Sequence, residues 1–108
     1  MAGNINMAIS LGIFVSSDQH LDKIIKLCRA ANKKNIKVLI FFTHLGILLT
    51  RDPGFKELEG MAEMALCKVS LESHGLKKIL IPGIDEKDYT TQAKHAEIIE
   101  ECDRYMVF

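Results

Sequence analysis

Two nearly continuous apolar runs joined by an amphipathic stretch constrain the fold more than any other feature of this sequence. The runs cover residues 7–15 and 37–42 and contain β-branched and aromatic side chains, as is typical of strands buried on both faces of a sheet. Between them, Leu21, Ile24 and Cys28 recur at helical spacing. Because two buried strands joined by one helix form a right-handed crossover, a parallel pair in an α/β fold is predicted.

The rest of the chain predicts further alternation of strands and helices. Residues 61–66 are rich in the helix formers Met, Ala and Leu, but their place between two expected helices favours a third strand. The whole pattern predicts a three-layer α/β sandwich around a mostly parallel sheet. The other expected elements are helices over residues 68–74 and 90–101, an edge strand over residues 78–81 and a terminal strand over residues 104–108.

Length and charge narrow the class of protein. A chain of 108 residues has room for one domain, residues 1–108. The 14 basic and 14 acidic side chains cancel, so no basic surface predicts direct binding of nucleic acid. No apolar tract reaches the roughly 18 residues that span a membrane, and no Lys or Arg precedes Lys23 to form the basic region of a signal peptide. We therefore expect a cytoplasmic protein that binds no membrane.

The three cysteines differ in their expected positions. Cys28, Cys67 and Cys102 are odd in number and widely spaced, which predicts neither a disulfide framework nor a zinc knuckle. Cys28 and Cys102 fall on expected helices and are interpreted as packing residues. Only Cys67 lies between a strand end and a helix start, where the helix N-terminus and Lys68 would favour the nucleophilic thiolate. A sulfur nucleophile and a small buried apolar residue both fit this position.

Further polar side chains are expected near Cys67, because ligands of open α/β sheets bind beyond the carboxyl ends of the strands. Thr43 and His44 follow the second strand, while Ser70 and His74 lie on the helix after Cys67. Ser70 could hydrogen-bond an anion on the sulfur, and either histidine could supply a proton or a charge. A zinc site of Cys67, His44 and His74 matches no metal-ligand spacing, and no glycine-rich phosphate loop is present. No metal and no cofactor are predicted.

Two short segments resemble a known family. Residues 67–75, CKVSLESHG, resemble the C-x-x-S-φ-x-x-x-G element of the DsrE/DsrF-like (YchN-like) family of small sulfur-relay proteins. Residues 41–46, FFTHLG, resemble that family's F-F-T-aromatic-aromatic-G segment, with His44 and Leu45 in place of the aromatic pair. The early apolar strand, residues 82–84 and the terminal strand over residues 105–108 also fall in the family's order, so the resemblance covers essentially the whole chain. It implies a parallel five-stranded α/β/α sandwich, assembly as a dimer, trimer or hexamer, and a cysteine at position 67 that carries sulfane sulfur as a persulfide.

The expected function is therefore that of a cytoplasmic sulfur carrier of the sulfurtransferase type that relays sulfane sulfur between donor and acceptor proteins through Cys67. Two alternatives stay open: an oligomeric binding or scaffold protein in which Cys67 is structural, and a Cys/His metal-binding protein. Residues 47–49, Ile-Leu-Leu, would form an exposed apolar patch on a monomer. We expect a homo-oligomer in which this loop packs against a neighbouring subunit.

Overall fold

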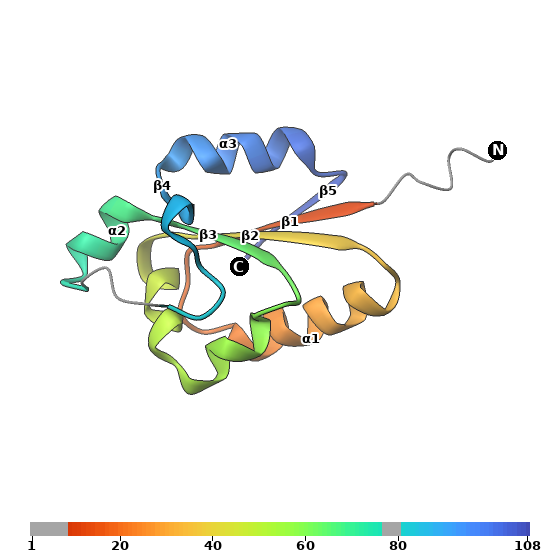
Figure 1. Ribbon diagram of the computed structural model, residues 1–108, viewed down its shortest axis with the longest axis horizontal. Helices are drawn as coiled ribbons and strands as arrows, with labels where there is room; N and C mark the ends of the chain where they lie inside the picture. The colour runs from red at the N-terminus through yellow and green to blue at the C-terminus, as the bar shows by residue number, and fades with distance from the viewer. Residues whose placement is uncertain (1–8, 77–80) are drawn as a thin grey trace.

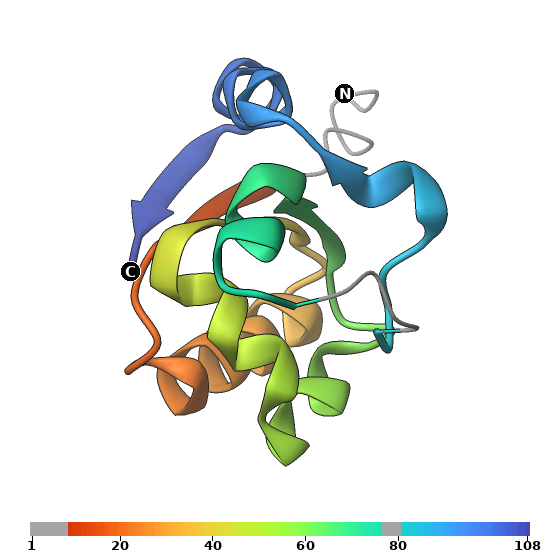
Figure 2. The ribbon, with the colours of Figure 1, turned by 90° about the vertical axis from the view of Figure 1, so that its left-hand side faces the viewer.

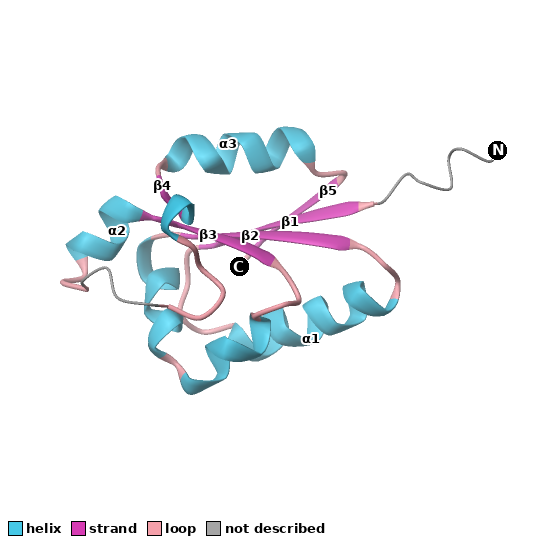
Figure 3. Ribbon diagram, in the orientation of Figure 1, coloured by secondary structure: helices cyan, strands magenta, loops and turns pink. Residues whose placement is uncertain are grey.

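The computed structural model describes residues 9–76 and 81–108, and these contain a five-stranded sheet of order β4-β3-β2-β1-β5. All neighbouring strands are parallel. One face is covered by α1 and the 3₁₀ helices η2 and η3 and the other by α3, while α2 lies beyond one end of the strands (Figure 1, Figure 3). The predicted three-layer α/β sandwich is thus confirmed.

The strands are β1 (Ser10–Val15), β2 (Lys37–Phe42), β3 (Glu63–Cys67), β4 (Tyr89–Thr90) and β5 (Arg104–Val107). The helices are α1 (Leu21–Lys33), η2 (His44–Arg51), η3 (Pro53–Leu58), α2 (Lys68–Ser73), η4 (Glu86–Asp88) and α3 (Gln92–Glu101).

The crossover predicted from the two apolar runs forms the centre of the molecule. In β2, every residue after Lys37 is buried, because one face of this strand packs against α1 and the other faces α3. The strand pairs with β1 in a register that places Phe41 opposite Phe14. The amphipathic pattern of α1 directs Ile24, Cys28 and the other apolar residues of that helix into the core.

The third strand forms despite its helix-forming composition. β3 pairs with β2, with Leu66 opposite Phe42, and Met64–Cys67 are buried. Pairing and burial in the sheet outweigh the local preference of Met, Ala and Leu for a helix, which is worth only tenths of a kcal/mol per residue. The prediction of a strand from position is confirmed.

The edge beyond β3 differs from the expectation. The expected edge strand over residues 78–81 lies largely outside the described residues, since 77–80 are not described. In the described part, β4 is the neighbour of β3, with Cys67 opposite Thr90. The last helix consequently begins at Gln92 rather than at position 90, and the Thr91 hydroxyl caps it by accepting a hydrogen bond from the Ala93 N–H at 3.3 Å.

The expectation that residues 47–49 form an exposed patch is wrong. Ile47 is 0% and Leu49 4% exposed, because η2 turns both side chains into the core of the same chain. The loop therefore gives no argument for a homo-oligomer. The large apolar side chains exposed in the described part of the chain are Ile9, Leu45, Val69, Ile99, Met106 and Val107.

Candidate functional site

Cys67 lies at the carboxyl end of the sheet, as the last residue of β3 and directly before α2. Figure 2 looks at this end, with α2 in front and η2, in yellow, beside it. The Cys67 side chain points to the α3 face of the sheet, where it packs with Phe41, Ala65 and Ile98. The residue is 4% exposed. The sulfur is therefore held in a defined place at the surface of the smaller core, not in open solvent.

A chain of hydrogen bonds surrounds the sulfur. The hydroxyls of Thr43 and Ser70 lie 3.1 Å apart, and the Ser70 oxygen also accepts the backbone N–H of His44 at 3.1 Å. The amide of Gln92 donates to the Thr43 oxygen at 3.0 Å. Because the Thr43 oxygen accepts a hydrogen bond from Gln92, the Thr43 O–H is free to donate to a neighbour. Thr43, which follows β2, and residues of η2, α2 and α3 thus each contribute a group to the surroundings of a thiol carried by β3.

These donors determine the acidity of Cys67. Burial raises the pKa of its thiol, but the effect of burial is outweighed by hydrogen bonds, and the pKa lies below its ordinary value of 9.0. The donors are the Ser70 hydroxyl, the Ser70 backbone N–H, the Gln92 amide and the Thr43 hydroxyl. The other two thiols behave oppositely. Burial raises the pKa of Cys28 to about 11 and raises that of Cys102 as well. The thiolate, which is the nucleophilic form, is thus favoured at Cys67.

The predicted site residues divide into two groups. The side chains of Thr43 and Ser70 are hydrogen-bonded at the sulfur as expected. His44 takes part through its backbone N–H, presented by a left-handed conformation with φ of +48°, while its side chain is exposed. Lys68 is exposed, and the Cys67 pKa is lowered by hydrogen-bond donors rather than by its charge.

His74 lies at the far end of α2 from the sulfur. It caps the C-terminus of this helix, about 10 Å along the axis from Cys67 at 1.5 Å per residue. Within residues 9–76 and 81–108, no group of three or more His, Cys, Asp or Glu side chains is placed to hold a metal ion. Cys67, His44 and His74 are therefore not assembled as a metal site.

Gln92 is the site residue that the sequence did not indicate. The sequence predicts a helix that begins at position 90, which assigns Gln92 no role at the sulfur. In the structure β4 ends at Thr90, opposite Cys67, so α3 begins close enough for the Gln92 amide to hydrogen-bond the sulfur. The only signal that could identify Gln92 is the pairing of β4 with β3, and a two-residue strand leaves no recognisable pattern.

Comparison with known proteins adds no relative. No model of a protein family matches the chain, and no curated protein matches it either. In the part of the chain that the structure describes, no helix is long and apolar enough to cross a lipid bilayer. The functional argument therefore depends on the geometry at Cys67.

Proposed function

We propose that this protein is a sulfur carrier that accepts sulfane sulfur on Cys67 and passes it on as a persulfide. The observation that carries the proposal is the set of hydrogen-bond donors from Thr43, Ser70 and Gln92, which lowers the pKa of a buried thiol. A thiol with a purely packing role needs no such donors. Cys28 is an example, since burial alone raises the pKa of its thiol.

The proposed transfer needs no external oxidant or reductant. The Cys67 thiolate attacks the outer sulfur of a donor persulfide R–S–SH. A new S–S bond forms at Cys67 while the donor S–S bond breaks, and its electron pair leaves on the donor as the thiolate R–S⁻. The proton stays on the transferred sulfur. An acceptor thiolate then attacks that outer sulfur in the same way and returns Cys67 to the thiolate.

The surroundings of Cys67 suit a bound persulfide. In a persulfide, the outer sulfur would stand about 2 Å from the Cys67 sulfur, which accepts hydrogen bonds from Thr43, Ser70 and Gln92. These donors stabilise negative charge on the Cys67 sulfur. Cys67 is only 4% exposed, which limits the access of water to the S–S bond. The resemblance to the DsrE/DsrF-like family agrees with this proposal, which includes a cytoplasmic location, donor and acceptor proteins as partners and a homo-oligomer.

Mass spectrometry of the protein after incubation with a sulfane donor tests the function. The wild type is expected to gain one sulfur atom at Cys67, and the Cys67→Ser variant is expected to gain none. Cys102→Ser is the matched control, because it removes a thiol of greater exposure and raised pKa. A label that persists in Cys67→Ser, or that resides on Cys28, would contradict the proposal and favour a scaffold protein with a structural Cys67.

A further inference from the structure

The helix α3 carries Gln92, and apolar packing attaches it to the sheet mainly at its other end. It runs back over the sheet from β4 toward the start of β5 (Figure 1). Of the residues of α3, all of which the structure describes, Ile98 alone is buried. Ile98 packs over Gly12 of β1, where an added Cβ would lie 2.7 Å from the Ile98 Cγ2 atom. Gln92 is about 9 Å from Ile98 along the helix axis, at 1.5 Å per residue. This contact therefore does not fix the turn that holds Gln92.

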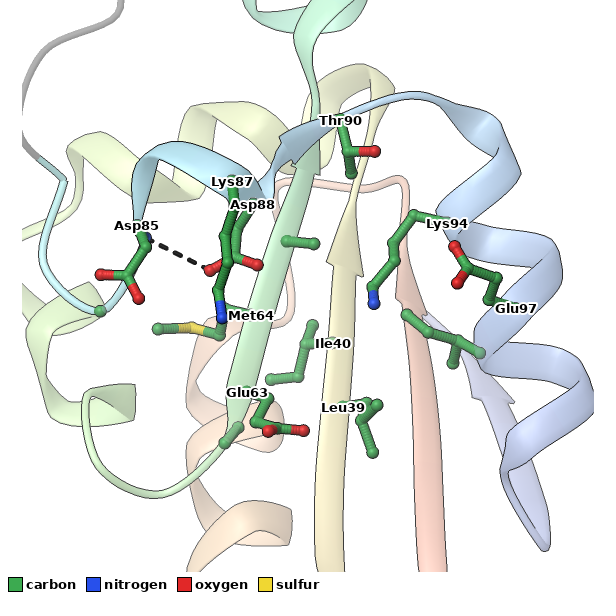
Figure 4. A pocket seen from close by; sticks show the side chains of 14 residues that line it. Leu39, Ile40, Glu63, Met64, Asp85, Lys87, Asp88, Thr90, Lys94 and Glu97 are labelled. Atoms are coloured by element: carbon green, nitrogen blue, oxygen red, sulfur yellow. Dashed lines mark hydrogen bonds between the residues drawn. The ribbon is translucent and has the colours of Figure 1, made fainter.

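A cavity separates part of α3 from β3. Its volume is about 480 Å³, and the described residues that line it include Lys94 and Glu97 of α3 and Leu39 and Ala65 of the sheet. Figure 4 shows the side chains of Lys94 and Glu97 on the helix side of this space. Because the cavity supplies no fixed partner atoms, packing against β3 does little to set the rotation of α3 about its axis.

His95 attaches α3 to the other strands of the sheet. Its ring stacks on the Phe14 ring of β1, with the centroids 4.0 Å apart and an interplanar angle of 24°. The Phe41 ring of β2 lies 5.9 Å from the His95 ring, at an angle of 8°. A ring nitrogen of His95 is hydrogen-bonded to the Tyr105 hydroxyl of β5. His95 thus contacts β1, β2 and β5 at once.

The His95 ring is mostly neutral at neutral pH. Burial lowers the pKa of His95 below its ordinary value of 6.5, because the protonated ring would lose water among the surrounding aromatic rings. A neutral imidazole has one N–H donor and one acceptor nitrogen, and either can pair with the Tyr105 hydroxyl. The attachment therefore consists of an aromatic stack and a neutral hydrogen bond.

His95 and Gln92 are neighbours on the surface of α3, since residues three positions apart on a helix lie on the same side. The Gln92 amide donates to the Thr43 oxygen at 3.0 Å and hydrogen-bonds the Cys67 sulfur. Hydrogen bonds weaken steeply as their angles and distances depart from the optimum. A small rotation of the first turn of α3 would therefore break both. Thr91 caps this turn at its start, and His95 holds it one turn later.

We propose that His95 is a positioning residue for Cys67: by stacking on Phe14 and binding Tyr105, it holds the first turn of α3 where the Gln92 amide reaches the sulfur. His95 is not among the groups that hydrogen-bond the sulfur, so it acts through Gln92. The inference rests on the proposed function in that Cys67 is the reacting thiol. Its test is alkylation, which involves no transfer of sulfur.

A double-mutant cycle between His95 and Gln92 tests this role. The rate of Cys67 alkylation by iodoacetamide is measured as a function of pH, by mass spectrometry of the peptide that contains Cys67. In His95→Ala, alkylation at neutral pH is expected to slow about ten-fold, as on loss of one hydrogen bond to a charged group, and the pH profile is expected to move to higher pH. Gln92→Ala is expected to have the same effect.

The double variant shows whether His95 acts through Gln92. In the Gln92→Ala background, His95→Ala is expected to slow alkylation no further, because the donor that His95 positions is already absent. A second ten-fold loss in the double variant would overturn the proposal. An unchanged pH profile in either single variant would overturn it as well.

Ala96→Gly is the matched control. Ala96 is the exposed neighbour of His95, and glycine weakens the helix through backbone entropy without removing an aromatic contact. Urea unfolding is expected to show a lower stability of Ala96→Gly, while its alkylation profile stays that of the wild type. A profile shifted as far as in His95→Ala would mean that any weakening of α3 has this effect, and His95 would have no specific role.

Tyr105→Phe provides the test if His95→Ala does not fold. It removes the hydroxyl bonded to His95 and leaves the stack on Phe14 in place. Alkylation of Cys67 is expected to slow about three-fold, the effect of a weak neutral hydrogen bond, and only when Gln92 is present. An unchanged rate, or an equal slowing in the Gln92→Ala background, would contradict the role of His95.

Uptake of sulfur separates this inference from the proposed function. Inorganic polysulfide is expected to form the Cys67 persulfide more slowly in His95→Ala than in the wild type, by the same factor as alkylation. If the wild type takes up no sulfur while the cycle gives the expected alkylation rates, the carrier function fails and the positioning role stands. If both proteins take up sulfur and are alkylated at equal rates, the positioning role fails and the carrier function stands.

Discussion

At the scale of single residues, the neighbours of a thiol decide its chemistry more than its burial does. Cys28 and Cys67 are both buried, at 0% and 4% exposure. Cys28 packs in the larger core, and burial alone raises its pKa to about 11. At Cys67 the same effect is outweighed by donors from Ser70, Gln92 and Thr43. The fold thus holds one thiol in its neutral form and makes another more acidic.

Removal of the Ser70 hydroxyl tests this argument. In Ser70→Ala the Cys67 thiolate loses one donor, so its pKa is expected to rise and alkylation by iodoacetamide at neutral pH to slow by roughly ten-fold, as for one hydrogen bond to a charged group. The measurement is the rate of alkylation as a function of pH. Ser73→Ala is the control, since Ser73 is an exposed residue of the same helix whose hydroxyl donates to the Ser70 carbonyl. An unchanged pH profile in Ser70→Ala would show that Ser70 does not set the acidity of Cys67.

At the scale of elements, η2 packs closely against the end of β1, and this contact positions the start of η2 beside Cys67. Gly46 makes this approach possible: a Cβ there would lie 2.2 Å from the carbonyl oxygen of Val15, and its N–H bonds the Thr43 carbonyl at 2.8 Å. The turn that follows Thr43 therefore depends on a residue without a side chain.

Gly46→Ala is expected to destabilise the protein by about 3 kcal/mol, because the clash is with backbone that cannot move aside. Urea unfolding measures the change. Gly54→Ala is the matched control, since a Cβ there meets only the Asp52 carboxylate, at 3.3 Å, and ordinary contacts. An equal loss of stability in both variants would contradict this account of the turn.

The start of α3 fixes the position of Gln92. Thr91→Ala removes the hydroxyl that accepts the Ala93 N–H and is expected to cost about 1 kcal/mol of unfolding free energy, measured with urea. Because a frayed first turn would also withdraw Gln92, alkylation of Cys67 is expected to slow at neutral pH. Gln19→Ala, a change in an exposed loop, is the control. Loss of stability with unchanged alkylation would show that the cap does not position Gln92.

The elements differ in how far the sequence predicts them. The β1–α1–β2 crossover follows from periodicity, because long apolar runs and an amphipathic helix are strong local signals. The strand β3 is predicted only from its position between two helices, because its residues prefer a helix. Thr43, Ser70 and Cys67 were predicted because strand ends meet at one edge. Gln92 was not, because its place depends on the pairing of β4, which is two residues long and stabilised by tertiary contacts.

At the scale of the whole molecule, burial of Cys28 makes stability depend on pH. Its pKa is about 11 in the folded state, against an ordinary value of 9.0. The unfolded chain therefore loses the proton first as pH rises. The contribution of the neutral thiol is complete below pH 9 and is lost between pH 9 and 11, by about 2–3 kcal/mol at 1.36 kcal/mol per pH unit.

Comparison of the wild type with Cys28→Ala isolates this effect. The difference in unfolding free energy between the two proteins is expected to shrink as pH rises from 8 to 10.5, because only the wild type carries the buried thiol. Cys102→Ala, which removes a partly exposed thiol, is expected to show a smaller dependence. A difference that stays constant with pH would mean that Cys28 titrates normally in the folded state.

The parallel pairing of β1 with β5 joins segments more than ninety positions apart in the chain, since Leu11 lies opposite Arg104. During synthesis, β1 can gain its second neighbour only after the segment Arg104–Val107 has left the ribosome. Until then Leu11 and its neighbours present an open strand edge, the kind of surface through which nascent chains aggregate or recruit chaperones. The pairing of β1 in the sheet is thus complete only after β5 has been translated.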